Sequence, residues 1–352
     1  MTLAIIAITS GGASLARKLH DQVVEAELWL PEKFRRTDTA NYYAEKLADL
    51  LPQLFRRVDG LVCIMATGIV VRLLAPHLTT KDQDAAVVVC DEAGQHAISL
   101  LSGHLGGANE LAQEVAEILE GKAVITTATD VNHLPAFDEV ARKCNMAVEP
   151  LDRIKLLNSL LLDQKPITLV DSEGSVAAAY LDIPFVTSAR SFATALQQDA
   201  DGFVFVSNRY LPLLKEQDNL LALRPRNLAL GIGCNRDTSP DEIEMVVRQT
   251  LRDAFLAFAS IGAIASIDAK QDEIGLLQFA KKYRLPVHFY SAEELNAIDS
   301  PTPASEYVQN AVGAKGVCEP AAIKLSGGGR LLVQKKKNGN VTVAVAEIIK
   351  KQ

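Results

Sequence analysis

The stretch from Ala86 to Thr127 decides the fold class, and it reads AVVVCDEAGQHAISLLSGHLGGANELAQEVAEILEGKAVITT. It begins with the apolar, Val-rich run Ala86–Cys90 and ends with a similar run, Ala123–Thr127. Between them, Gly106–Glu120 carries apolar side chains at helical spacing, namely Leu111, Val115, Ile118 and Leu119. Because buried strands that alternate with amphipathic helices form βαβ units, this stretch predicts a largely parallel sheet.

The same alternation extends toward the N-terminus. Leu3–Thr9 and Leu61–Met65 read as further buried strands, and Ala13–Asp21 reads as a helix. The first apolar run is short and no basic segment precedes it, so a strand explains it better than a signal peptide. We therefore expect an α/β fold that starts with an N-terminal parallel-sheet domain over residues 1–138.

Two further α/β regions are predicted beyond this domain: a small middle region over residues 139–225 and a C-terminal mixed-sheet domain over residues 226–352. The middle region is supported by a helix at Leu151–Leu162 and strands at Pro166–Asp171 and Gly202–Ser207. The C-terminal domain is supported by a strand at Leu228–Gly233, a helix from Ser239 to about Leu256 and a hairpin turn at Lys336–Gly339.

The composition excludes several classes of protein. Of 352 residues, 48% are hydrophobic and 5% aromatic, and the net charge is −7. An acidic chain poor in aromatic residues argues against nucleic-acid binding. No apolar stretch approaches the roughly 18 residues that span a bilayer. The five cysteines are widely spaced, without a CxxC pair, which favours reduced thiols and a cytoplasmic protein.

The densest group of chemically useful residues lies in the turn Ser99–Asn109, before the predicted helix at Gly106. His104 could serve there as a base or an acid, and the first helical N–H groups favour an anion, so those of Gly106 and Gly107 are candidate oxyanion donors. A helix N-terminus should also lower the pKa of His104. The alternative is a structural turn in which glycines pack closely and the histidine caps a carbonyl. Candidate substrate-binding residues in the turn are Ser102, Gly103, Gly106, Gly107 and Asn109.

Several other turns follow predicted strands of the N-terminal domain. Because the carboxyl ends of parallel strands share one edge of a sheet, we expect these turns to lie together with His104. Aspartate and threonine are also common after strands simply as turn formers and helix caps. The candidate residues are Ser10, Gly11, Gly12, Thr67, Gly68 and Thr127 for binding, the turn residue Asp91, and Glu92 and Asp130 as catalytic carboxylates beside His104.

Two glycine loops in the C-terminal region are candidate contact loops. The first lacks the third glycine of a dinucleotide fingerprint, because Arg236 stands there, so a nucleotide-binding enzyme is disfavoured. The second, a glycine run before Arg330, also reads as a flexible hairpin loop. The histidines lack metal-ligand spacing, so no metal site is indicated. Candidate contacts in the two loops are Gly231, Gly233, Asn235, Ser326 and Gly327.

Eight motifs along the chain resemble those of the CbiG family of cobalt-precorrin-5A hydrolases, which act in anaerobic cobalamin biosynthesis. The C-terminal motifs are also similar to the standalone CobE protein of the aerobic pathway. In the N-terminal region the motifs are Met65–Arg72, Val88–Glu92, Ser99–Asn109 and Val124–Asp130, and in the C-terminal region Gly231–Cys234, Ala265–Asp268, Asp272–Leu277 and Val317–Ala322.

The resemblance implies a reaction in which water opens the ring-A δ-lactone of cobalt-precorrin-5A and the two-carbon unit at C-20 leaves as acetaldehyde, giving cobalt-precorrin-5B. The substrate carries its own cobalt, so no cofactor or separate metal is expected. On the ground of chemistry and placement, and not of the family, His104 would act as the base, with Glu92 or Asp130 orienting it or sharing proton transfer. The alternative within the same pathway is a non-catalytic protein that binds and hands over corrinoids. A homodimer and contacts with neighbouring pathway enzymes stay open.

Overall fold

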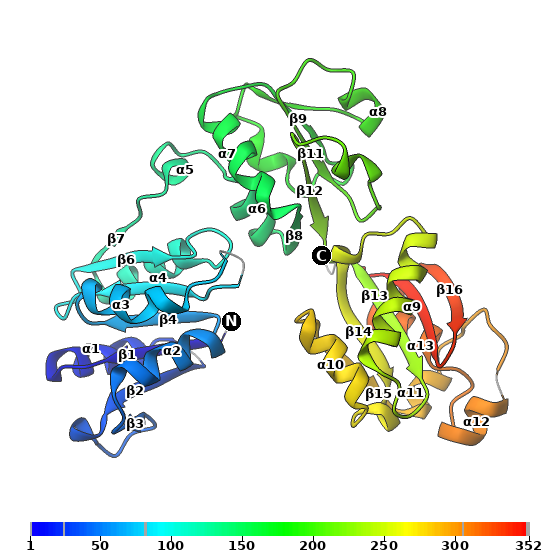
Figure 1. Cartoon of the computed structure of the whole chain (residues 1–352), viewed down its shortest axis with the longest axis horizontal. Helices are drawn as coiled ribbons and strands as arrows, with labels where there is room; N and C mark the ends of the chain where they lie inside the picture. The colour runs from blue at the N-terminus through cyan, green and yellow to red at the C-terminus, as the bar shows by residue number, and fades with distance from the viewer. Residues whose placement is uncertain (1, 24, 81–82, 305, 350–352) are drawn as a thin grey trace. The chain divides into compact units, whose positions relative to one another are not determined.

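The computed structural model describes residues 2–23, 25–80, 83–304 and 306–349, and these residues form three separate β-sheets with helices against them (Figure 1). The chain divides into two compact units: residues 1–142 with 161–163, and residues 143–160 with 164–352. The α/β class is confirmed. The domain boundaries at 138/139 and 225/226 stay predictions. Within the described residues, no helix has the length and apolar character to cross a bilayer.

The N-terminal sheet has seven strands, and every neighbouring pair runs parallel except β5 and β6. Across the sheet, the strands are β3 (Asn41–Tyr43), β2 (Ala26–Pro31), β1 (Leu3–Ala7), β4 (Gly60–Ile64), β5 (Ala86–Cys90), β6 (His96–Leu101) and β7 (Lys122–Val124). The helices are α1 (Ser10–His20), α2 (Leu47–Arg57), α3 (Thr67–Leu74), α4 (Ala108–Leu119), α5 (Ala128–Val131) and α6 (Phe137–Lys143).

Helices cover both faces of this sheet, as the unbroken apolar strands require. Successive side chains of a strand point to opposite faces, so Ile5 packs with α1 and α4 while Ile6 packs with α2 and α3. Val88 and Val89 of β5 divide between the two cores in the same way. Each central strand therefore lies between two layers of helices.

The hairpin between β5 and β6 reverses the chain direction. The Asp91 carboxylate accepts hydrogen bonds from the backbone N–H groups of Ala93, Gln95 and His96, and these bonds stabilise a tight turn directly after β5. Gly94 adopts a positive φ of 71° within it. Strand β6 consequently runs antiparallel to β5, and β7 follows the direction of β6.

The second unit contains two five-stranded mixed sheets. The middle one has the order β10 (Val186–Ser188), β9 (Ile167–Val170), β11 (Gly202–Val206), β12 (Leu220–Pro225) and β8 (Met146–Glu149), with α7 (Ile154–Leu162) and α8 (Phe192–Ala195). The C-terminal one has the order β15 (Val287–Tyr290), β14 (Ile261–Ile267), β13 (Leu228–Cys234), β17 (Val341–Glu347) and β16 (Leu331–Asn338), with α9 (Pro240–Asp253), α10 (Ile274–Lys282), α11 (Ala292–Asn296), α12 (Glu306–Val312) and α13 (Cys318–Leu325).

Candidate functional site

His104 lies in the tight turn that joins β6 to α4. The turn starts at Ser102, whose backbone has a positive φ of 56° and whose hydroxyl donates to the carbonyl of Asp84. A Cβ at Gly106 would stand 2.5 Å from the Ser102 Cβ, and Gly107 has a φ of 88°. Glycines are therefore required at both positions by the turn itself, as the structural alternative proposed.

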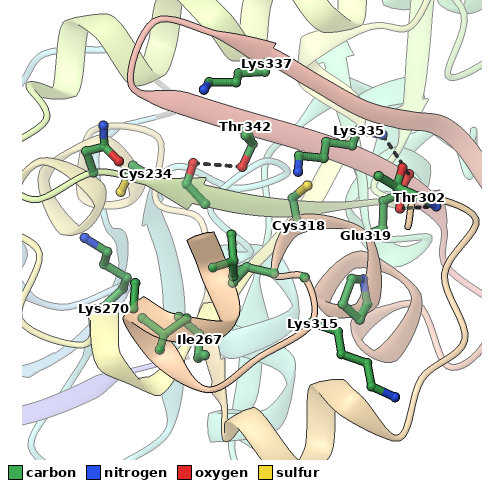
Figure 2. A pocket seen from close by; sticks show the side chains of 18 of the residues that line it. Cys234, Ile267, Lys270, Thr302, Lys315, Cys318, Glu319, Lys335, Lys337 and Thr342 are labelled. Carbon is green, nitrogen blue, oxygen red and sulfur yellow. Dashed lines mark hydrogen bonds between the residues drawn. The ribbon is translucent and has the colours of Figure 1, made fainter. Parts of the chain in front are cut away.

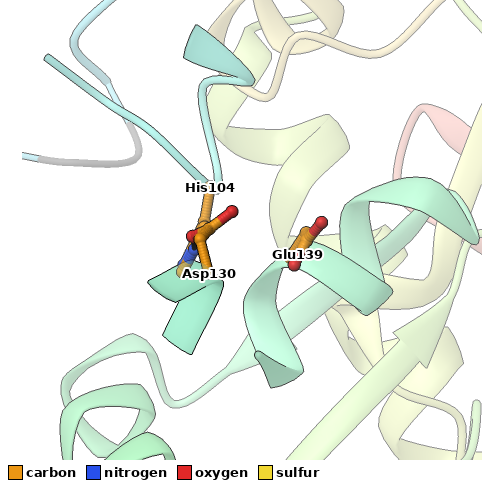
Figure 3. Close-up of side chains that lie close together, drawn as sticks. All are labelled: His104, Asp130 and Glu139. Atoms are coloured by element: carbon orange, nitrogen blue, oxygen red, sulfur yellow. Dashed lines mark hydrogen bonds and ion pairs between the residues drawn. The ribbon is translucent and has the colours of Figure 1, made fainter. Parts of the chain in front are cut away.

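The His104 imidazole is held between two carboxylates. Its Nε2 lies 2.8 Å from Asp130 Oδ2, and its Nδ1 lies 3.3 Å from Asp138 Oδ1. The exposed fractions of the side chains are 9% for His104, 20% for Asp130 and 11% for Asp138. Figure 3 shows His104 against Asp130, which belongs to the short helix α5. His104 and Asp130 are thus in contact, as the sequence analysis expected. Asp138 is a second partner of the imidazole, which the sequence did not reveal.

Asn109, in the first turn of α4, positions Asp130. Its Nδ2 donates to Asp130 Oδ2 at 3.0 Å and to Thr127 Oγ1 at 3.3 Å, while its Oδ1 accepts from the Ser99 hydroxyl. A side chain at Gly103 would collide with the Asn109 amide, because a Cβ there would lie 2.7 Å from Asn109 Oδ1. Three of the predicted residues, Asn109, Thr127 and Asp130, therefore form one polar network with His104, and Gly103 packs against it.

The pKa of His104 is raised, contrary to the expectation from the helix N-terminus. Burial of the ring acts to lower it, but the hydrogen bonds and charges of Asp138 and Asp130 outweigh burial and bring the pKa to about 9. His104 is therefore an imidazolium near neutral pH. A protonated imidazole donates hydrogen bonds from both nitrogens, so the group is suited to act as an acid and not as a base.

The N–H groups at the start of α4 are engaged within the turn. The Gly107 N–H donates to the His104 carbonyl, the Ala108 N–H to Ser102, and the Asn109 N–H to Gly103. The expectation that Gly107 donates to an oxyanion is wrong, because its N–H already has a backbone partner. The corresponding role of Gly106 stays a prediction.

The predicted turns occupy two edges of the N-terminal sheet. Ser10, Thr67 and Asp91 follow β1, β4 and β5, which are parallel to one another. His104 follows the antiparallel strand β6, and Asp130 comes after β7, which is parallel to β6. The prediction of a single shared edge is wrong, because the hairpin at Asp91 places the His104 turn at the opposite edge.

A cavity of about 390 Å³ lies at the first of these edges. Thr9, Thr67 and Glu92 line it together with apolar side chains, among them Ile8, Ile64, Met65, Ile69, Val89 and Ile98. Glu92 approaches Gly11 so closely that a Cβ there would lie 2.1 Å from Glu92 Oε1. Glu92 is therefore not a partner of His104. The N–H of Gly12 donates to Thr9 Oγ1, and the carbonyl of Gly68 accepts from Arg72, so both glycines have local structural contacts. The binding roles of Ser10, Gly11, Gly12, Thr67 and Gly68 stay predictions.

A larger cavity of about 620 Å³ lies in the C-terminal region, where α13 packs against β13 (Figure 2). The predicted Gly233 and Asn235 line it. The acidic lining residue, Glu319, is 2% exposed and accepts hydrogen bonds from Thr302 and from the backbone N–H of Lys335. Five basic residues that sequence reasoning missed line the cavity, and two of them have carboxylate partners: Arg236 pairs with Asp272, and Lys270 pairs with Glu273. The excess of positive charge therefore comes from the other three, Lys315, Lys335 and Lys337.

The other predicted C-terminal contacts have structural roles. A Cβ at Gly231 would stand 1.7 Å from the Cys318 carbonyl oxygen, so this glycine lets α13 pack directly on β13. Ser326 ends α13, and its hydroxyl accepts from the N–H of Gly329. Gly327 follows with a φ of 74°. Gly231, Ser326 and Gly327 are not among the residues that line the cavity.

One group of side chains has the composition of a metal site. Atoms of His104, Asp130 and Glu139 lie within 4.8 Å of one another, with Glu139 on α6 (Figure 3). A cation at this place would have to displace the proton that Nε2 shares with Asp130. The expectation that the protein needs no metal of its own stays a prediction.

Comparison with known proteins defines the class of this α/β protein as one of cobalamin biosynthesis. Three family models match along the chain: "Cobalamin synthesis G N-terminal" at residues 49–130, "Cobalamin biosynthesis central region" at 135–225 and "Cobalamin synthesis G C-terminus" at 228–346. The chain belongs to the CbiG family, which confirms the resemblance seen in the motifs.

The relatives include curated enzymes. The chain is 37% identical to the cobalt-precorrin-5A hydrolase of Priestia megaterium, over 98% of this chain and 94% of that protein. It is 35% identical to the Salmonella typhimurium cobalt-precorrin-5A hydrolase, over 98% and 97% respectively. The CobE protein of Sinorhizobium sp. is 37% identical over 34% of this chain and 79% of its own length.

Proposed function

We propose that this protein is a cobalt-precorrin-5A hydrolase that opens the ring-A δ-lactone and releases acetaldehyde. The observation that carries this proposal is the similarity to two such hydrolases over 98% of the chain, which includes the region of His104. A CobE-like handover role would need only the part that matches CobE, which is 34% of the chain. The free thiols of all five cysteines suit the cytoplasm.

The chemistry requires one proton donor at the lactone. Water adds to the lactone carbonyl, the ring C–O bond breaks to give a carboxylate, and the released oxygen becomes the carbonyl oxygen of acetaldehyde. The C–C bond to C-20 breaks at the same stage, and its electron pair enters the conjugated macrocycle. His104, as an imidazolium held by Asp130 and Asp138, gives a proton to the ring oxygen as the C–O bond breaks, while the proton that the attacking water loses goes to solvent. The hydroxyl so formed loses its proton to solvent as the C–C bond breaks and its oxygen becomes the carbonyl oxygen.

The C-terminal cavity suits the other part of the task, which is to hold a large polycarboxylate. Lys315, Lys335 and Lys337 are among its five basic lining residues. Carboxylates that bear the charge of a tetrapyrrole form charge-assisted hydrogen bonds with such groups. Apolar residues such as Ile267 and Val312 line other parts of the cavity, which suits the macrocycle.

The experiment is to mix the purified protein with cobalt-precorrin-5A and to measure the acetaldehyde chromatographically and the corrinoid product by mass spectrometry. We expect one acetaldehyde per substrate consumed, with no nicotinamide or ATP, and the same rate after treatment with EDTA. Binding without turnover would favour the handover role. An absolute requirement for NAD or ATP would contradict the proposal, and loss of activity with EDTA would contradict the expectation that no protein-bound metal is needed.

A further inference from the structure

We infer that Asp138 is a positioning residue for His104: it holds Nδ1 of the imidazole from the buried side and keeps Nε2 turned toward Asp130 and the more exposed side of the cluster. The inference rests on the proposed function of His104. Its basis is the asymmetry of the two carboxylates, which contact different ring nitrogens from different helices.

Asp138 is buried, whereas Asp130 is closer to solvent. Asp138 occupies the first turn of α6, between Phe137, which is fully buried, and the rest of a helix whose Val140 and Ala141 are also buried. Asp130 belongs to a four-residue helix, and its side chain is 20% exposed. The group that holds Nδ1 is therefore fixed by packing, and the group at Nε2 is the one that a ligand can approach.

The contact at Nδ1 limits how the ring can turn. Asp130 Oδ2 lies 2.8 Å from Nε2 at the more exposed side, and Asp138 Oδ1 lies 3.3 Å from Nδ1 in a buried place, so each ring nitrogen has its own carboxylate. A carboxylate in this position also fixes the plane of the ring, as second partners of histidines do elsewhere.

Two other charged residues share the helix of Asp138. Glu139 brings a carboxylate oxygen within 4.8 Å of atoms of His104 and Asp130, and Arg142 forms an ion pair with Glu110 of α4. The guanidinium of Arg142 also lies close to Gly107, where a Cβ would be 3.2 Å from its Nη1. Nδ1 is contacted by Asp138, and Nε2 is contacted by Asp130 at 2.8 Å and by the buried Thr129 hydroxyl at 3.4 Å.

The test uses the full-length protein and the variant Asp138→Asn, with Glu114→Gln on the exposed side of α4 as a control that removes the same charge. Ring protons and carbons of ¹³C-labelled histidine are followed by NMR against pH, and the His104 signal is identified by its loss in His104→Gln. We expect Asp138→Asn to lower the pKa of His104. We also expect turnover to fall by about 10- to 100-fold, with its loss at high pH moved toward lower pH. Glu114→Gln should change neither.

Each outcome separates this inference from the proposed function. An unchanged His104 titration in Asp138→Asn would overturn the role of Asp138, as would a variant that keeps the wild-type rate and pH profile. If Asp138→Asn does not fold, titration of the wild type decides: an ordinary pKa for His104 would contradict the pairing. If the titration behaves as expected but even the wild type releases no acetaldehyde, the proposed function has failed while the contact at Nδ1 stands.

Discussion

The ion pairs of His104 should make the stability of the N-terminal unit depend on pH, and replacing His104 with glutamine should remove that dependence. The pKa of His104 in the folded state, about 9, lies above the ordinary value of 6.5. A raised pKa means that the folded state holds the proton more tightly than the unfolded state. The stabilisation is therefore complete below pH 6.5 and is lost as the pH rises through about 9.

The magnitude follows from these two values. Between pH 7 and pH 10, linkage gives a loss of about 2.5 kcal/mol in the free energy of unfolding of the wild type. Solvent reaches the cluster through Asp130, which is 20% exposed, and screening reduces the expected loss to about 1 to 2.5 kcal/mol. Glutamine carries no charge at either pH. The difference in stability between the wild type and His104→Gln should therefore shrink by this amount.

The single tryptophan makes the assay specific. Trp29 lies on β2 in the N-terminal unit, so its fluorescence during denaturant unfolding reports on that unit within the full chain. His96→Gln is the matched control, because His96 also faces a carboxylate, Asp91 at 3.4 Å, but is half exposed. The difference in unfolding free energy between His96→Gln and the wild type should change by less than about 0.5 kcal/mol over the same pH range. If the difference in unfolding free energy between the wild type and His104→Gln stays the same from pH 7 to pH 10, the assignment of His104 as an imidazolium is refuted.

Three further predictions concern turnover, binding and folding. His104→Ala should lose about 10²- to 10⁴-fold in acetaldehyde release and His104→Asn should be equally poor, whereas rescue by asparagine would indicate a structural role. Binding of cobalt-precorrin-5A is measured by absorbance titration in the His104→Ala background. Lys315→Ala and Lys337→Ala, which alter the cavity lining, should weaken binding about tenfold, and the control Lys281→Ala on α10 should leave it unchanged. Equal affinities in all these variants would exclude the cavity as the binding site. A fragment of residues 226–352 should unfold cooperatively on heating, and an aggregated fragment would count against an autonomous domain.

The layers of the fold could be predicted because the apolar runs are long and regular. Ala86–Cys90 is the strand predicted, and Ser239 caps α9 through the N–H of Glu242, as its pattern indicates. Strand β6 was not among the strands predicted from the sequence, so the reversal of chain direction was missed as well. Once His96–Leu101 is taken as a strand, chain length gives its direction, because five residues separate Cys90 from His96 and a parallel crossover needs about a dozen or more. With this rule, the sequence itself predicts the reversal and the second edge.

The charge state of His104 was beyond the reach of local sequence reasoning. The helix N-terminus argument counts about half a unit charge from the dipole, and the N–H groups of Gly107 and Asn109 are already used within the turn. Two full carboxylate charges, at 2.8 Å and 3.3 Å, have the opposite and larger effect. Asp138 comes from a later helix, where an aspartate in the first turn reads as an ordinary favourable charge for the dipole. Tertiary packing thus turns the expected base into an acid, and the rate of lactone opening should fall, not rise, as the pH passes the pKa of His104.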